Sequence, residues 1–250
     1  MFSQNILLNK DQTTINEFRE ELSKLGKNIM DEDEEMFNLF EEEINSQLEL
    51  IKLCSIVCRF KGDFIKSQLN EVFKNITTIM GILCLYEQGH IGSAEMLFRN
   101  VYEGLVIYKY IAVFKDFDLY SKWENGKQIN LKKDVFSKLF KKPSVESVEF
   151  WDFLNKYTHA TIYSQDNILE CSDSRRSNFY SILTVLVEMN YNFFNSFVLS
   201  AYNYYLKYYF SDVYALEKNK IREMLKKMTK MVDERCKKVI KEYKSRWNEK

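Results

Sequence analysis

The sequence predicts an all-α fold: a bundle of about six to eight helices, with long amphipathic helices at its N- and C-terminal ends. Glycine and proline are scarce, with 7 Gly and 1 Pro in 250 residues, whereas a β-rich or doubly wound chain of this size needs many more turn residues. Apolar residues make up 46% of the chain and recur at spacings of three and four, which is the helical period. They also supply a substantial core, which excludes a disordered chain.

At the N-terminal end we expect a weakly structured segment followed by a long acidic helix. Residues 1–30 are weakly patterned, so we expect a weakly structured segment with a short helix over 15–25 that Gly26 ends. Residues 31–60 predict a long helix, because aspartates suit its N-terminal end and apolar side chains between residues 37 and 58 form one stripe.

A central helix is expected over residues 93–113, after a helix over 64–88 and a glycine-containing turn. Ser93 is in the position of an N-cap. One face of this helix is apolar, and the opposite face places Arg99 and Glu103 among aromatic and aliphatic side chains. A helix that is apolar on both sides lies at the centre of a bundle, so we expect Arg99 and Glu103 to be partly buried.

The C-terminal half is expected to start with short helices and loops over 116–147 and a short helix over 145–157. A long helix over 175–210 contains twelve aromatic residues between Phe179 and Phe210, most of which must be buried because each carries a large apolar area. The last helix, over 214–247, is basic and has an apolar stripe at helical spacing, so it needs a surface to pack on.

The two ends of the chain carry opposite charge although the net charge is zero. Residues 31–49 hold nine acids and no Lys or Arg, and residues 218–250 hold thirteen Lys or Arg against five acids. We therefore predict a bundle core over 31–212 and a basic helix over 213–250 that packs on the core or on a homodimer partner. This helix also favours contact with a protein partner or with RNA, whereas zero net charge argues against a large nucleic-acid footprint.

The cysteines and the apolar stretches predict a cytoplasmic protein. The five cysteines are odd in number and scattered through apolar helical sequence, as is typical of reduced, buried thiols. No signal-peptide pattern begins the sequence. The longest uncharged stretch, Met189 to Leu206, contains four asparagines, which disfavours a membrane span.

Motifs for phosphate cradling and for serine hydrolysis (G-x-x-x-x-G-K-[ST], G-x-G-x-x-G and G-x-S-x-G) do not occur in the sequence. Two histidines are too few for a multi-histidine metal site. Glu87 and His90 have the E-x-x-H spacing of di-iron bundles, but the second copy that such a site needs is missing. We therefore expect neither a metal nor a cofactor.

The candidate catalytic residues are Arg99, Glu103 and His159. An arginine in a core needs a carboxylate partner, and Glu103 is one helical turn away. His159 follows a short aromatic helix. One interpretation is an Arg–Glu–His brace between helices; another is a site in which His159 is the acid or base and Arg99 stabilises an anion. A third is that these groups do not meet.

The stretch from Gly92 to Glu103, Gly-Ser-Ala-Glu-Met-Leu-Phe-Arg-Asn-Val-Tyr-Glu, is followed by Tyr108-Lys-Tyr-Ile. It resembles a helix in a family of uncharacterised bacterial all-helical proteins, in which a small residue precedes L-x-R-x-x-x-E, an apolar run and a Tyr. A later Tyr157-Thr-His is similar as well, and the resemblance covers about residues 65–205. It implies a helical fold and no established activity.

The helical plan also distantly resembles HEPN proteins, many of which are RNA-cutting toxins or defence components. Their active site is an R-x(4–6)-H motif on one helix. Arg99, Arg175 and Arg176 have no histidine four to six residues downstream, so the sequence departs from this motif.

Two functions follow as expectations. The first is a non-enzymatic interaction or regulatory module in a bacterial stress-response or phage-defence system, which the opposite charges of the end helices favour. The alternative is a HEPN-like toxin or hydrolase that acts on RNA or nucleotides through His159 and Arg99.

Overall fold

The computed structural model describes residues 15–57, 63–139, 145–158, 172–199 and 215–247, and every element in them is helical. The all-α bundle with long helices at both ends is therefore confirmed. The α-helices are α2 (Ile15–Val57), α3 (Asp63–Glu87), α4 (Ile91–Phe114), α5 (Phe117–Glu124), α6 (Ser137–Leu139), α7 (Val145–Thr158), α9 (Asp173–Phe193) and α11 (Ala215–Trp247); the π-helices are η1 (Leu131–Phe136) and η2 (Phe194–Leu199).

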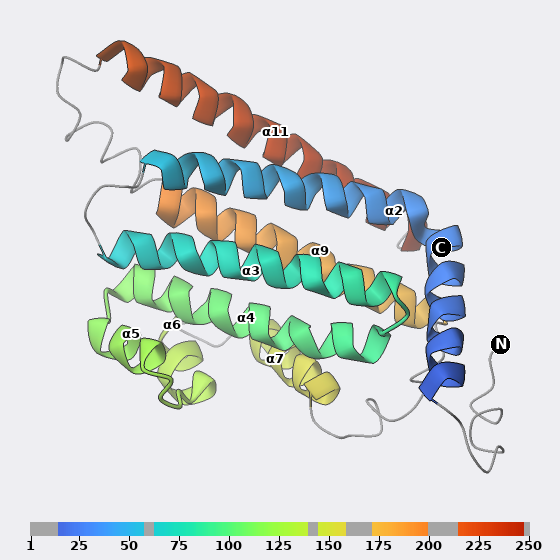
Figure 1. Ribbon diagram of the computed structural model, residues 1–250. Helices are drawn as coiled ribbons and strands as arrows, with labels where there is room; N and C mark the ends of the chain where they lie inside the picture. The colour runs from blue at the N-terminus through green and yellow to red at the C-terminus, as the bar shows by residue number, and fades with distance from the viewer. Residues whose placement is uncertain (1–14, 58–62, 140–144, 159–171, 200–214, 248–250) are drawn as a thin grey trace.

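The long helices run beside one another, with α11 on the outside (Figure 1). Helix α11 packs on α2 and α9, α2 packs on α3, and α3 packs on α4. Helices α7 and α9 both contact α4. The basic helix thus packs on the acidic helix within the chain, which was one of the two expected pairings.

Helix α4 lies at the centre of the bundle, as its two apolar faces predict. From Val101 to Ala112 only Glu103 and Lys109 are not buried. Aromatic side chains of α9 pack on it and on α3: the ring of Phe179 stacks on Tyr86 with centroids 3.7 Å apart and lies 5.2 Å from Phe98. These contacts bury large apolar areas and fix how α3, α4 and α9 pack.

The prediction that Gly26 ends a short helix is wrong, because α2 continues without a break from Ile15. Residues 15–30 are therefore the first turns of α2 and not a weakly structured segment. Gly26 is needed for a close crossing: a Cβ there would collide with the carbonyl oxygen of Glu87 and lie 2.9 Å from the carbonyl carbon of Gln88. The glycine thus lets the backbone of α2 cross the α3–α4 turn.

The prediction that Ser93 caps α4 is also wrong, because the helix begins two residues earlier. Its N-cap is His90, whose side chain makes no capping hydrogen bond. Gly89 adopts φ +79°, which L side chains rarely adopt, and this turn brings Ile91 into the core as the first helical residue.

The aromatic C-terminal stretch forms α9 and η2 rather than one unbroken α-helix. Residues 200–210 of the expected helix lie outside the described residues. Before them the hydrogen bonding changes to the π type from Phe194, and the aromatic side chains of Tyr191, Phe193 and Phe194 are buried as expected.

Candidate functional site

A row of charged residues follows one face of α4 at one-turn spacing: Glu95, Arg99 and Glu103. Residues four apart on a helix lie above one another. Arg99 contacts Trp151 of α7 and Glu95 contacts Arg175 of α9, so the row lies on the side of α4 that these two helices cover. We take it as the candidate site.

Arg99 and Glu103 meet, as their spacing predicts. The Nε of Arg99 donates to the Oε1 of Glu103 at 2.8 Å, and the two side chains are 26% and 21% exposed. The guanidinium also lies over the ring of Trp151 in α7, 4.6 Å from its centroid, which is a cation–π contact. The pair is thus half-buried between α4 and α7.

His159, the third predicted site residue, lies outside the described residues. Helix α7 ends at Thr158, directly before it. Whether His159 belongs to the site therefore stays a prediction.

Arg175 of α9 joins the row at its other end. Its Nε and Nη2 donate to the two carboxylate oxygens of Glu95 at 3.0 and 2.7 Å. Glu95 is 4% exposed and Arg175 is 16% exposed, so this two-point pair lies deeper than the pair formed by Arg99. Arg175 is held at the start of α9 by Ser172, whose Oγ accepts from the backbone N–H of Arg175 at 3.3 Å.

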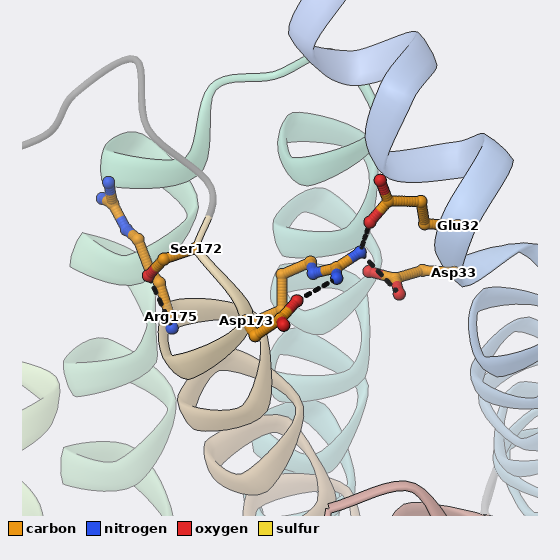
Figure 2. Close-up of polar contacts among 6 residues, drawn as sticks. Glu32, Asp33, Ser172, Asp173 and Arg175 are labelled. Atoms are coloured by element: carbon orange, nitrogen blue, oxygen red, sulfur yellow. Dashed lines mark hydrogen bonds and ion pairs between the residues drawn. The ribbon is translucent and has the colours of Figure 1, made fainter. Parts of the chain in front are cut away.

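The next residue, Arg176, binds carboxylates of α2. Its guanidinium donates to Glu32, to Asp33 at 3.5 Å and to Asp173 in its own helix. Figure 2 shows Glu32, Asp33 and Asp173 gathered together while the side chain of Arg175 points away from them. Neighbouring positions on a helix project about 100° apart, so one turn of α9 binds both α4 and α2.

Burial and a neighbouring positive charge shift the pKa of Asp33 in opposite directions. Burial raises the pKa of its carboxyl above the usual value, and the positive charge of Arg176 lowers it. The balance is a raised pKa, because desolvation of a nearly covered carboxylate outweighs a partner 3.5 Å away.

A second polar cluster joins α2, α9 and α11. The amide nitrogen of Gln47 donates to Glu43 at 2.9 Å, and that of Asn190 donates to Gln47 at 3.1 Å. Burial raises the pKa of Glu43 to about 7. Arg235 of α11 donates to the carbonyl oxygen of Glu42 at 3.1 Å and to the hydroxyl of Ser46, so α11 is held to α2 by polar contacts as well as by apolar packing.

Sequence reasoning missed the Glu95–Arg175 pair and the cluster around Arg176. Glu95 carried a local signal, because it lies one turn before Arg99 on the same face. Arg175 and Arg176 carried no local signal beyond their position after a polar stretch, because their partners on α4 and α2 are distant in sequence.

The arginines of these clusters are neutralised by neighbouring carboxylates. Each of Arg99, Arg175 and Arg176 is bound to at least one carboxylate, and a guanidinium does not act as a base in proteins. Such pairs fix the relative positions of α2, α4, α7 and α9. Over the part of the chain that the structure describes, no group of three or more His, Cys, Asp or Glu side chains could hold a metal ion.

The outer side of α11 differs from the site on α4, because it carries lysines that face solvent. We define the outer lysine row as Lys220, Lys227, Lys238 and Lys241, which are all exposed. Their spacings are close to whole turns, so they share one side of the helix. Within the described ranges none of them forms an ion pair. No described helix is long and apolar enough to cross a bilayer.

Comparisons of the chain with protein-family models, with curated proteins and with solved structures found no match.

Proposed function

We propose that the protein is a non-enzymatic interaction module that binds an acidic protein partner through the outer side of α11. The observation that carries the proposal is the outer lysine row, which is exposed along a helix whose opposite side is occupied by α2 and α9. The site on α4 then serves to hold the bundle rigid beneath this surface.

The anchoring of α11 supports this role. Near its C-terminal end Arg246 donates to Glu35 of α2 at 2.7 Å and to Glu242 in its own helix at 2.8 Å. Leu225, Val232 and Val239 are buried beneath the helix. A helix fixed in this way presents its lysines in a constant arrangement, which reduces the entropy lost when a partner binds.

The test compares capture of proteins from a lysate of the native host by three purified, tagged proteins. They are the wild type, the variant Lys227→Glu/Lys238→Glu/Lys241→Glu, and the control Lys27→Glu/Lys109→Glu/Lys127→Glu. The control makes the same charge change at exposed lysines outside α11.

We expect a partner to be retained by the wild type and the control and lost by the α11 variant. Its retention should fall as salt rises, because exposed charges are screened. Equal retention by all three proteins would contradict the proposal. Loss of the captured proteins after ribonuclease treatment would show that RNA bridges them and that no acidic protein binds directly.

The alternative proposal is hydrolysis of RNA or nucleotides through His159 and Arg99. One observation favours it: α7, which directly precedes His159, packs on the helix that carries Arg99. Incubation with total cellular RNA, beside a His159→Ala variant of matched thermal stability, tests it. Cleavage by the wild type alone supports hydrolysis, and intact RNA with both proteins argues against it.

A further inference from the structure

A cavity of about 480 Å³ lies between α11 and the junction of α9 with η2. Tyr191 and Asn195 form one wall, and residues from Arg222 to Asp233 of α11 form the other. Its volume falls in the range of ligand pockets, roughly 300–1,000 Å³. It is separate from the candidate site on α4.

The cavity is positively charged. Arg222, Lys226 and Lys230 line it at successive turns of α11, so three cations lie in one line along its wall. Asp233 is the one acid among its described lining residues, and it accepts a hydrogen bond from Lys237 at 2.6 Å. Lys230 is 3.7 Å from the exposed Glu234, which is a weak pair at the surface.

Two of these cations have no anion of their own within the described ranges. Neither Arg222 nor Lys226 forms an ion pair there, in contrast to Arg246 further along the same helix, which pairs with Glu35 of α2. Their charges are therefore available to a ligand.

A threonine and a tyrosine add neutral polar groups to the wall of the cavity. Thr229 lines the cavity, and its side-chain oxygen is buried without a hydrogen-bond partner among the described residues. The hydroxyl of Tyr191 donates to the backbone oxygen of Thr229 at 3.0 Å and fixes this part of the wall.

We propose that this pocket binds the phosphate end of a small phosphorylated ligand, held by Arg222, Lys226 and Lys230. The planar guanidinium of arginine binds two phosphate oxygens at once, and lysines add point charges. The cavity is larger than a phosphate group alone, and the buried Leu225 supplies an apolar surface for an organic moiety. A nucleoside diphosphate has this combination of charge and size.

The proposal goes beyond the interaction module and can be tested independently of it. Isothermal titration calorimetry of the full chain is performed with ADP, with inorganic pyrophosphate and with a short single-stranded RNA. The pocket variant is Arg222→Gln/Lys226→Gln. Its control, Lys109→Gln/Lys127→Gln, removes the same charge from exposed lysines outside α11, and thermal unfolding confirms that both are folded.

We expect saturable one-to-one binding of ADP to the wild type and the control, and binding weakened roughly tenfold or more in the pocket variant. If the pocket variant is less stable than wild type, Lys226→Gln alone provides the test, because Lys226 is exposed. Four outcomes would overturn the proposal: no saturable ADP binding, equal weakening in both double variants, binding of pyrophosphate without ADP, or binding of RNA without ADP.

Discussion

The pair between Glu95 and Arg175 makes a quantitative prediction about stability. Replacing Glu95 with Gln removes the negative charge from a side chain that is 4% exposed and leaves the charge of Arg175 with poorer compensation. Breaking a buried pair in this way costs about 3–5 kcal/mol. Because Arg175 retains some exposure and Gln keeps one acceptor oxygen, we expect the free energy of unfolding to fall by about 2–3 kcal/mol.

The matched control is Glu103→Gln. It breaks a pair with the same chemistry on the same helix face, but Arg99 and Glu103 are both about one-quarter exposed. Pairs that reach solvent contribute about 1 kcal/mol or less. The assay is urea unfolding of both variants, followed by far-UV circular dichroism at neutral pH and at two salt concentrations. The Glu95 effect should change little with salt, and the Glu103 effect should shrink.

Equal losses in the two variants would refute this reasoning, since burial would then not set the strength of the pair. A loss below about 1 kcal/mol for Glu95→Gln would refute it as well. The single variants Glu95→Gln and Arg175→Met, together with the double variant Glu95→Gln/Arg175→Met, give the coupling energy. We expect the double variant to be less destabilised than the sum of the single variants, because removing both partners leaves no buried charge.

Three further predictions concern the rest of the bundle. Gly26→Ala should lower the free energy of unfolding by about 2–4 kcal/mol, because its Cβ would meet the backbone of the α3–α4 turn. Gly81→Ala is the control: a Cβ there has nothing within 4 Å, so this variant should raise the free energy of unfolding by about 0.5–1 kcal/mol. Urea unfolding measures both. The pKa of Glu43 is raised from 4.5 to about 7, so the folded state binds this proton more tightly than the unfolded state. The free energy of unfolding should therefore fall by up to about 3 kcal/mol as the pH rises from 4.5 to 7. A pH series compares the wild type with Glu43→Gln, which should lack this dependence on pH. Arg235→Ala removes two hydrogen bonds to α2 and should lower the free energy of unfolding by about 1–2 kcal/mol. Limited proteolysis should cleave α11 faster in this variant. An unchanged cleavage rate would show that apolar packing alone holds the helix.

The positions of the helices could be predicted because they depend on local patterns. Apolar spacing located the helix over 64–88, and the structure has α3 at Asp63–Glu87. The Arg99–Glu103 pair was predictable for the same reason, because helical geometry alone places residues four apart side by side. The pairing of α11 with α2 followed from charge and apolar stripes, although both a pairing within the chain and one across a dimer satisfied the pattern.

The errors arose where a distant segment sets the local structure. Gly26 resembled a helix end because glycine is common there, yet its role depends on a turn about sixty residues away. The partner of Glu95 comes from α9, and no periodicity relates positions so far apart. The cavity beside Arg222 and Lys226, which have no ion-pair partner among the described residues, could not be predicted because α9 and η2 supply its other wall.

The electrostatics of the site favour interaction over catalysis for a specific reason. An arginine that stabilises a developing anion does so best when its charge is uncompensated and aimed at the reacting atom. The guanidinium of Arg99 is instead bound to Glu103 at 2.8 Å and stacked on Trp151, so an anionic substrate would have to displace a carboxylate. On α11, Arg222 and Lys226 have no such carboxylate partner among the described residues. The charges available for binding are therefore on the outer helix, and those on α4 are engaged in holding the bundle together.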